Sequence, residues 1–381
     1  MPGERRAVIV GGGIGGLTAA IALRRAGVDA TVYERAPELR EVGAGIGLWA
    51  NALHVFRRLG LAADVFRLGA GPLGGGIRTR GGRWLTRQPA TVLEGRWAEP
   101  TIAVMRADLQ ALLLGALPPD AVRLDAHAVS VRQANDGVTV RFENGQEATG
   151  DVVVGADGLR SVVRTQLFDP RPPRYRGYTA WRGVTRPGAV ADVDQASEFW
   201  GRGERFGLLP VRDRRVAWYA SANAPEGSID AFGPMAALRE RFDRWTAPVP
   251  AVLAATPEAT IAKNDVYDRR PTRRWVVGRA VLLGDAAHPM TPDLGQGGCQ
   301  AIVDAWALAD SLSTAHDIAG ALRDYQRRRW RAASVATLVA RSLGQVGQWE
   351  HPVACWARAG VLRATPLWLQ LRTLDEVMRD G

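Results

Sequence analysis

The chain has 381 residues, of which 46% are hydrophobic and 23% charged, and this length predicts two or three domains with a sizeable core. It contains no run of 18 apolar residues, so we expect no membrane span. Only a few residues precede the first apolar run, so we expect no signal peptide. The two cysteines, Cys299 and Cys355, favour a reducing compartment, and we expect a cytoplasmic location.

The formal net charge is +10, and Lys263 is the only lysine among 49 basic residues. Such an excess indicates either binding of nucleic acid or other anions, or arginines spread over solvated surfaces. The arginines are dispersed, and no basic stripe is interleaved with aromatic residues. This distribution favours the second interpretation. We expect neither a nucleic-acid partner nor a metal ion.

A glycine-rich loop follows the first apolar run, Ala7–Val10. Gly11, Gly13 and Gly16 form the pattern Gly-x-Gly-x-x-Gly before an alanine-rich helical stretch. At such a corner the first glycine permits the turn, the second admits a pyrophosphate, and the third lets helix and strand pack closely. The helix N-terminus at Ile14 presents free N–H groups to phosphates. The loop predicts a dinucleotide site, with a ligand-free glycine turn as the alternative.

The next strand, Ala30–Tyr33, ends at Glu34, about 20 residues after the loop, where a carboxylate accepts a hydrogen bond from a ribose hydroxyl. Arg35 follows it. The stretch Val122–Phe142 alternates polar and apolar residues, and Asn135-Asp136-Gly137 within it indicates a hairpin turn. We count Arg35 and Val129 among the predicted cofactor contacts.

The later segments divide into two kinds. Short apolar runs predict buried parallel strands at Ile102–Val104, Asp151–Gly155 and Ala280–Gly284, and helical patterns follow Asn51 and cover Ala107–Ala116 and 298–342. Alternating stretches predict an antiparallel sheet from Tyr178–Val184, Arg205–Pro210 and Val216–Ala220, with helices at Pro234–Trp245 and Val249–Ala255.

The antiparallel block interrupts the parallel-type segments, so we predict an α/β fold in which a second domain is inserted into a Rossmann-like nucleotide-binding domain. The predicted nucleotide-binding domain covers 1–75, 100–172 and 273–340, and the predicted substrate domain covers 76–99 and 173–272. A C-terminal helical tail, 341–381, carries Trp349, Trp356 and Trp368. The tail either docks on the protein, lines a substrate entrance or touches a membrane surface.

Two further motifs follow buried strands. Asp157-Gly158 ends one strand, and Gly284-Asp285 ends another and leads to the turn Pro292–Gly298. Together with the glycine loop, these motifs resemble the class A flavin-dependent monooxygenases, the group of para-hydroxybenzoate hydroxylase. The resemblance covers about residues 5 to 340, and the chain is similar to the flavin-dependent urate and salicylate hydroxylases and to zeaxanthin epoxidase-like enzymes.

The resemblance implies a bound FAD. Asp285 would accept a hydrogen bond from a ribityl hydroxyl, Arg106 would reach the ribityl chain and pyrophosphate, and Asp157 would serve both FAD and the nicotinamide cofactor. The helix that begins near Gly298 would direct its positive end toward the flavin pyrimidine. Glycines in this turn would let the backbone lie against the ring, and they are Gly295, Gly297 and Gly298.

The resemblance also implies a reaction. NAD(P)H, for which no second glycine fingerprint is present, would reduce FAD, and O2 would then form a flavin C4a-hydroperoxide that hydroxylates an aromatic or conjugated small molecule. Epoxidation of an isoprenoid or polyketide alkene and an oxygen-independent reductase or dehydrogenase on the same fold stay open. A non-catalytic FAD-binding protein is the remaining alternative. The protein would be a monomer or a homodimer.

The antiparallel sheet is expected to floor the substrate pocket. Alternation places Arg205, Gly207 and Leu209 on one face, and Ala217 and Tyr219 on one face of the next strand. Leu209 and Tyr219 are therefore predicted to bind substrate. The urate enzymes carry a pocket tyrosine where this chain has Ala217, which indicates a roomier, apolar site.

Arg205, Asp293 and Pro292 are the predicted catalytic residues. Arg205 either faces Asp293 or an anionic substrate, or lies on the surface. Trp181 either stacks on a planar substrate or belongs to the core. His288 is expected to be structural, and the sequence shows no convincing general base.

Overall fold

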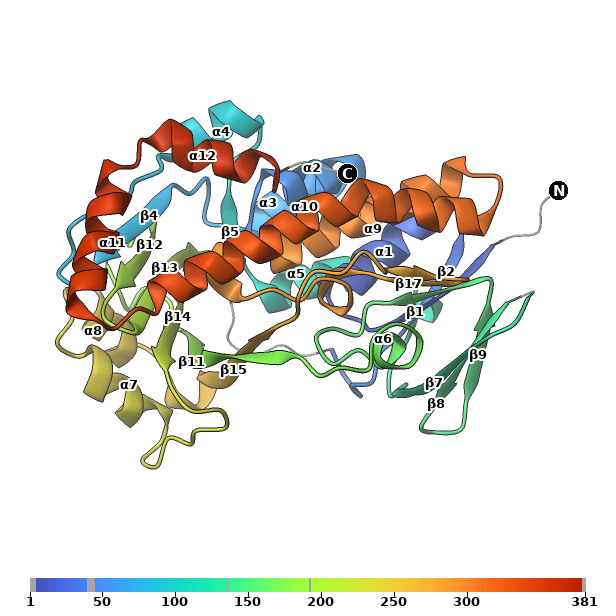
Figure 1. The fold of residues 1–381 in the computed structure, drawn as a ribbon, viewed down its shortest axis with the longest axis horizontal. Coiled ribbons are helices and arrows are strands. Elements are labelled where there is room, and N and C mark those ends of the chain that lie inside the picture. The colour runs from blue at the N-terminus through green and yellow to red at the C-terminus, as the bar shows by residue number, and fades with distance from the viewer. Residues whose placement is uncertain (1–4, 40–44, 136, 192, 379–381) are drawn as a thin grey trace.

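The buried apolar runs form a parallel sheet (Figure 1). The structure is a computed structural model that describes residues 5–39, 45–135, 137–191 and 193–378. The strand order in this first sheet is β16 (Val276–Val277), β17 (Ala280–Leu282), β10 (Val152–Gly155), β1 (Arg6–Val10), β2 (Asp29–Tyr33) and β6 (Val122–Arg123). All its pairs are parallel except β16–β17. The carboxyl ends of β1, β2, β10 and β17 therefore meet at one edge.

A second six-stranded sheet contains the alternating segments. Its order is β15 (Ala262–Asp268), β11 (Arg174–Val184), β14 (Arg215–Asn223), β13 (Glu204–Val211), β12 (Ala196–Trp200) and β4 (Gly75–Thr79). The pairs are antiparallel except β12–β4. The helices α7 (Pro234–Phe242) and α8 (Val249–Ala254) cover an aromatic layer on one face, which includes Phe206 and Trp218. The predicted α/β fold with an antiparallel second sheet is confirmed.

Smaller elements complete the framework. Two further sheets pair β3 (Gly45–Leu48) with β5 (Ile102–Met105), and β7 (Ala128–Gln133) with β8 (Val138–Phe142) and β9 (Glu147–Gly150). The other helices before the second sheet are α1 (Ile14–Arg25), α2 (Ala50–Arg58), α3 (Ala62–Leu68), α4 (Ala90–Trp97), α5 (Arg106–Gly115) and α6 (Val162–Leu167). Asp136, in the predicted hairpin turn, lies outside the described residues.

The C-terminal part is helical, as predicted, but its first stretch forms two helices. These are α9 (Gly297–Thr314) and α10 (Ile318–Gly347), followed by α11 (Pro352–Ala364) and α12 (Leu367–Asp375). The predicted helix is interrupted before α10, where the Asp317 carboxylate accepts a hydrogen bond from the Gly320 amide (2.7 Å) and caps the start of α10. Helix α10 crosses the molecule from the parallel sheet to the second sheet (Figure 1). The division into domains stays a prediction.

A buried carboxylate joins α9, α10 and the turn after β17. Asp304 of α9 accepts hydrogen bonds from Arg329 Nε (2.8 Å), from the Gly284 amide (3.1 Å) and from His288 Nε2 (2.6 Å). Burial alone would raise the pKa of Asp304, but His288 and Arg329 lower it to about 2. His288 is thus structural, as the sequence indicated.

We predict that Asp304→Asn lowers the free energy of unfolding by about 3–5 kcal/mol, because Arg329 is left buried without its counter-ion. Urea unfolding measures the change. The contribution of the carboxylate is present above its unfolded pKa of 3.8 and is lost as the pH falls through about 2. Asp310→Asn is the control, since Asp310 pairs with Arg328 nearer the surface of the same two helices and should cost about 1 kcal/mol or less. Equal losses in both variants would contradict this assignment.

Candidate active site

The glycine loop after β1 has two glycines that permit packing and one that faces open space. A Cβ atom on Gly16 would lie 1.9 Å from the Gly11 carbonyl oxygen, and one on Gly11 would lie 2.4 Å from the Ala156 oxygen. Gly11 also has a φ of +110°. A Cβ on Gly13 would meet nothing within 4 Å. The loop therefore leaves room for a ligand on the Gly13 side, at the N-terminus of α1 where Ile14 is buried.

Glu34 shapes this loop from the end of β2. Its carboxylate accepts hydrogen bonds from the Gly12 amide (2.6 Å) and from the Ala36 amide (2.9 Å). These bonds fix the side chain beside the loop. The predicted contact of Glu34 with a ribose stays a prediction.

A cavity of about 250 Å³ lies at this edge of the parallel sheet. The predicted cofactor residues that line it are Gly11, Gly13, Glu34, Arg35, Arg106 and Asp157. They come from the ends of β1, β2 and β10 and from the start of α5. Val129 does not line the cavity, because its side chain is exposed and Ala128 takes that position in β7.

Asp157 has one oxygen bound and one free. Its Oδ2 accepts hydrogen bonds from the amides of Val162 (2.7 Å) and Val163 (3.2 Å) at the start of α6. Its Oδ1 is buried and has no hydrogen-bond partner among the described residues. Burial raises the pKa of Asp157. Asp157 also lines the cavity, and a buried carboxylate oxygen without a partner in its wall fits a ligand that brings hydroxyl or amide donors, as FAD does.

Asp285 lies in the short 3-10 helix η3 (Gly284–Ala286) after β17, facing the start of α9. A Cβ on Gly297 would lie 3.7 Å from Asp285 Oδ1. Surrounding protein raises the pKa of this solvent-accessible carboxyl, whereas His288 and Arg106 lower it. Arg106 thus lines the cavity and also acts on the pKa of Asp285. The contact of both residues with a ribityl chain stays a prediction.

The glycines of the next turn differ in their structural reasons, and their predicted approach to the flavin ring stays a prediction. Gly295 follows the 3-10 helix η4 (Pro292–Leu294) with a φ of +66°, and its Cβ would lie 3.6 Å from the Trp49 indole nitrogen. A Cβ on Gly298 would lie 2.6 Å from Ile46. Trp49, which also contacts Trp97 edge to face, was not anticipated from the sequence.

Arg205 is buried and faces Asp293, one of the arrangements left open by the sequence. Its guanidinium forms an ion pair with Asp293, bonds Glu198 (3.1 Å) and donates to Gln348 Oε1 (2.8 Å). Burial alone would lower the pKa of Arg205, but Asp293 and Glu198 raise it further than burial lowers it. Asp293 also accepts from the Tyr178 hydroxyl (2.7 Å). This network holds η4, including Pro292, against the second sheet, so a surface position for Arg205 is excluded.

The alternation predicted for β13 and β14 is confirmed. Gly207 pairs with Tyr219, and Leu209 pairs with Ala217. A Cβ on Gly207 would lie 2.1 Å from the Tyr219 ring, so this glycine lets the ring cross the strand. The Tyr219 hydroxyl bonds Glu198, and burial raises its pKa well above its usual value.

The structure corrects the placement of Trp181. This side chain belongs to the aromatic layer beneath α7 and α8, and its indole donates to Asp230 (2.8 Å). That layer lies on the sheet face opposite Leu209 and Ala217. The core alternative holds because β11 alternates in register with β14, so that Trp181 turns to the same side as Trp218.

The sequence analysis missed three polar residues near Arg205 and Tyr219. Glu198 and Gln348 bind Arg205. Arg182 pairs with Tyr219 across the strands, and both burial and the charge of Arg106 lower its pKa. The alternation of residues 196–200 could have identified Glu198. Nothing local could have identified Gln348, because it reaches Arg205 from the end of α10, 143 residues away in sequence.

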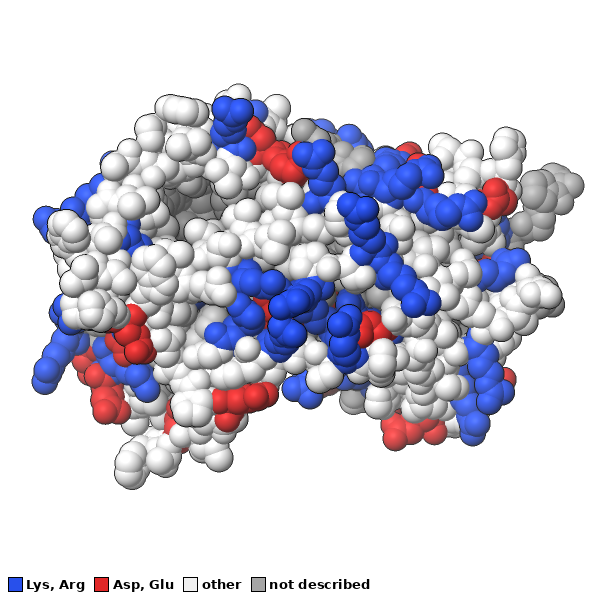
Figure 2. All heavy atoms as spheres, viewed as in Figure 1, with Lys and Arg blue, Asp and Glu red and all other residues white. Residues whose placement is uncertain are grey.

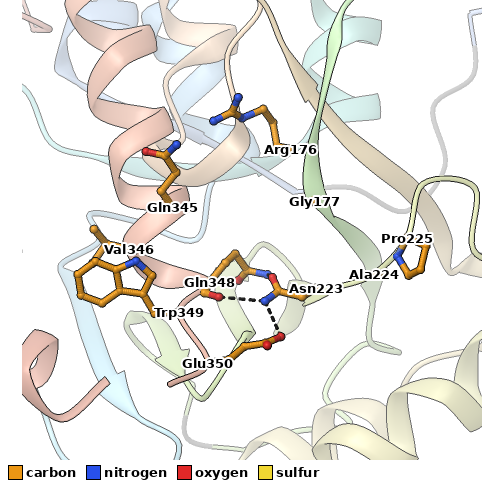
Figure 3. A pocket seen from close by; sticks show the side chains of 10 residues that line it. All are labelled: Arg176, Gly177, Asn223, Ala224, Pro225, Gln345, Val346, Gln348, Trp349 and Glu350. Carbon is orange, nitrogen blue, oxygen red and sulfur yellow. Dashed lines mark hydrogen bonds between the residues drawn. The ribbon is translucent and has the colours of Figure 1, made fainter. Parts of the chain in front are cut away.

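A larger groove of about 850 Å³ lies elsewhere, between β11, β14 and the end of α10 (Figure 3). Asn223 on its wall donates to the Gln348 carbonyl (3.0 Å) and to Glu350 (2.7 Å). None of the predicted site residues lines it. Among the described residues no group of acidic, histidine or cysteine side chains could hold a metal, and no helix is long and apolar enough to cross a bilayer.

We predict that Gly13→Ala weakens FAD binding without affecting stability, whereas Gly16→Ala also lowers stability. Gly13 has a φ of −71° and an open Cβ direction, so alanine should keep the thermal stability of the FAD-free protein but weaken FAD binding about tenfold. Alanine at position 16 should lower that stability as well. Thermal unfolding and fluorescence titration with FAD measure both effects. Unchanged FAD affinity in Gly13→Ala would contradict the assigned ligand side.

Comparison with known proteins places this site in a family. A family model described as an FAD binding domain matches residues 4–340. The chain is 44% identical over 356 residues to the aurachin C monooxygenase/isomerase of Stigmatella aurantiaca, covering 93% of each protein. It is 36% identical over 329 residues to an FAD-dependent urate hydroxylase of Klebsiella pneumoniae, covering 85% of each. A zeaxanthin epoxidase of Solanum lycopersicum is 36% identical over 349 residues, 85% of this chain and 52% of that protein.

The fold agrees with the sequence match. The crystal structure of Klebsiella pneumoniae HpxO complexed with FAD and uric acid superposes with a TM-score of 0.92 at 33% identity, covering 100% of this chain and 98% of that one. The glycine loop, Asp157 and Asp285 fit an FAD, and FAD is the cofactor of this enzyme. The chain belongs to the FAD-binding family, as a class A flavin-dependent monooxygenase.

Proposed function

We propose that this monooxygenase hydroxylates an aromatic or conjugated small molecule and consumes NAD(P)H and O2. The observation that supports the substrate class is the two-part face of the second sheet beside η4. At one end Leu209 packs with Ala217, Val184 and Met105 in an apolar cluster. At the other end Tyr219 and the Arg205 network supply hydrogen-bonding groups. A planar apolar ring with a polar substituent matches that division.

The bound FAD would accept hydride from NAD(P)H and activate O2. We assign Arg205, Asp293 and Pro292 a positioning role, since the two charged side chains are buried against each other and hold η4. Tyr219 would keep its proton, which it donates in a hydrogen bond to Glu198, because its pKa is raised well above its usual value. It is therefore unsuited to act as a general base near neutral pH.

Ala217 bears on the identity of the substrate. Its methyl group faces β3, where a Cβ on Gly45 would lie 2.4 Å away, and no polar side chain is contributed at this position. The resemblance implies a tyrosine there in urate enzymes. We therefore propose a more apolar substrate than urate.

We also propose a cytoplasmic location, which the two free cysteines, Cys299 and Cys355, support.

Epoxidation of an alkene is the second candidate. The apolar cluster around Leu209 supports it, because an alkene needs no base and few polar contacts. The similarity to a zeaxanthin epoxidase is compatible with this reaction.

Oxygen uptake and NAD(P)H oxidation, measured with the FAD-loaded enzyme across a panel of phenols, fused-ring aromatics and isoprenoid alkenes, test the proposal. We expect an aromatic or conjugated compound to stimulate both rates and to gain one oxygen atom from labelled O2. Epoxide formation alone would favour the second candidate. Rapid FAD reduction without oxygen consumption would overturn the monooxygenase mechanism.

We predict that Arg205→Ala lowers the product formed per NAD(P)H about tenfold, equivalent to ~1.4 kcal/mol in the partition between productive and unproductive oxidation. The physical reason is loss of the ion pair that holds η4 through Asp293. Product and peroxide are measured together. Arg241→Ala is the matched control, because Arg241 pairs with Glu204, beside Arg205 in β13, near the surface. An unchanged product yield in Arg205→Ala would refute the positioning role.

A further inference from the structure

Helix α11 packs against the rest of the protein through a charged side chain and not through an apolar stripe. The side chain that it buries is Arg358, which donates to the carbonyl oxygens of Val346 (2.7 Å), Gly347 (2.9 Å) and Gly201 (2.7 Å). The guanidinium also lies over the Trp200 ring. A surface helix ordinarily buries its apolar stripe. Here a charged residue anchors the helix, and apolar residues are left outside.

The exposed apolar residues continue from α11 into α12. Helix α12 buries Leu371 and Leu374. The outer side chains, with their exposed fractions, are Val353 (64%), Trp356 (78%), Val361 (65%), Trp368 (60%) and Leu369 (41%), and we name them the α11–α12 face. Isolated exposed apolar residues are common. Here five of them, two of which are tryptophans, occur on two successive helices, and this concentration leads us to ask what covers them.

The charge of this segment is one-sided. Between His351 and Leu374 the sequence contains no Asp or Glu, and Arg363 and Arg372 are exposed. Asp375, the last residue of α12, forms an ion pair with Arg96. The whole chain carries a net charge of +10. Tryptophan favours the boundary between hydrocarbon and water, and arginine binds phosphate. Both features match an anionic lipid surface. A two-fold contact with a second copy would instead oppose like arginines.

The α11–α12 face lies beside an opening. In Figure 2 the molecule is hollowed between α11, α12 and the end of α10, and most atoms around the hollow belong to uncharged residues. Strands β4, β12 and β13 of the second sheet lie behind it in the same view (Figure 1). Strand β13, one of the strands behind the hollow in this view, carries Leu209 and Arg205.

We propose that the α11–α12 face docks on an anionic membrane surface, so that a lipid-dissolved substrate enters through the adjacent hollow. The docking rests on the exposed residues and their charge. The statement about substrate rests also on the proposed function.

The test is flotation of the FAD-loaded protein with vesicles of phosphatidylcholine alone and with vesicles of equal parts phosphatidylcholine and phosphatidylglycerol. We expect binding to the anionic vesicles, reduced by salt. Trp356→Ser/Trp368→Ser should weaken this binding about tenfold, and Arg363→Gln/Arg372→Gln should weaken it on anionic vesicles. Brominated phosphatidylglycerol should quench tryptophan emission in the wild type more than in the double tryptophan variant.

Leu338→Ser, which changes an exposed leucine on α10 outside the α11–α12 face, is the matched control and should bind like the wild type. Absence of vesicle binding, or equal binding by the double tryptophan variant with normal FAD content, overturns the proposal. Conversion of a dimer to a monomer by that variant, without vesicle binding, would assign the face to a second copy. Flotation needs no turnover, so its outcome is independent of the oxygen-uptake test of the proposed function.

Discussion

The site depends on the buried carboxylate of Asp304. A charged group this far from water is stable only when its oxygens are bound, and here Arg329, His288 and the Gly284 amide bind them. Arg329 comes from α10, whereas Gly284 and His288 both belong to the turn after β17. One carboxylate therefore fixes the position at which Asp285 leaves the parallel sheet.

A second buried ion pair fixes the other end of the same segment. Asp293 in η4 is held by Arg205 from β13 and by Tyr178 from β11. Buried ion pairs add little net stability compared with apolar packing, but they tolerate few alternative geometries. The stretch from Asp285 to Gly297 is thus held by charge at both ends, on the parallel sheet and on the second sheet. Such a segment is suited to present backbone groups to a flavin in a fixed orientation.

The C-terminal helices are also held by a buried charged residue, but here apolar side chains are left exposed at the surface. Arg358 satisfies carbonyl groups at the end of α10, which are left free where a helix stops. Arg358 occupies the inner side of α11, and Trp356, two positions earlier, lies on the other side because successive residues turn by about 100° around the helix. The exposure of Trp356 follows from this anchoring.

The sequence by itself determined the parallel sheet, the glycine loop and the positions of Asp157 and Asp285, because each depends on a short apolar run followed by a turn. Alternation also placed Arg205 and Leu209 on one face of their strand and Ala217 and Tyr219 on one face of the next, and the register between the strands brought the two pairs to the same side. Tertiary structure alone decided the partners of these residues. Gln348 and Asp304 bind groups distant in sequence, Trp181 turned away from the site with its strand, and Val129 lay outside the cavity. Local periodicity fixes which face a residue occupies, whereas the partner across a buried ion pair is set by how separate elements pack.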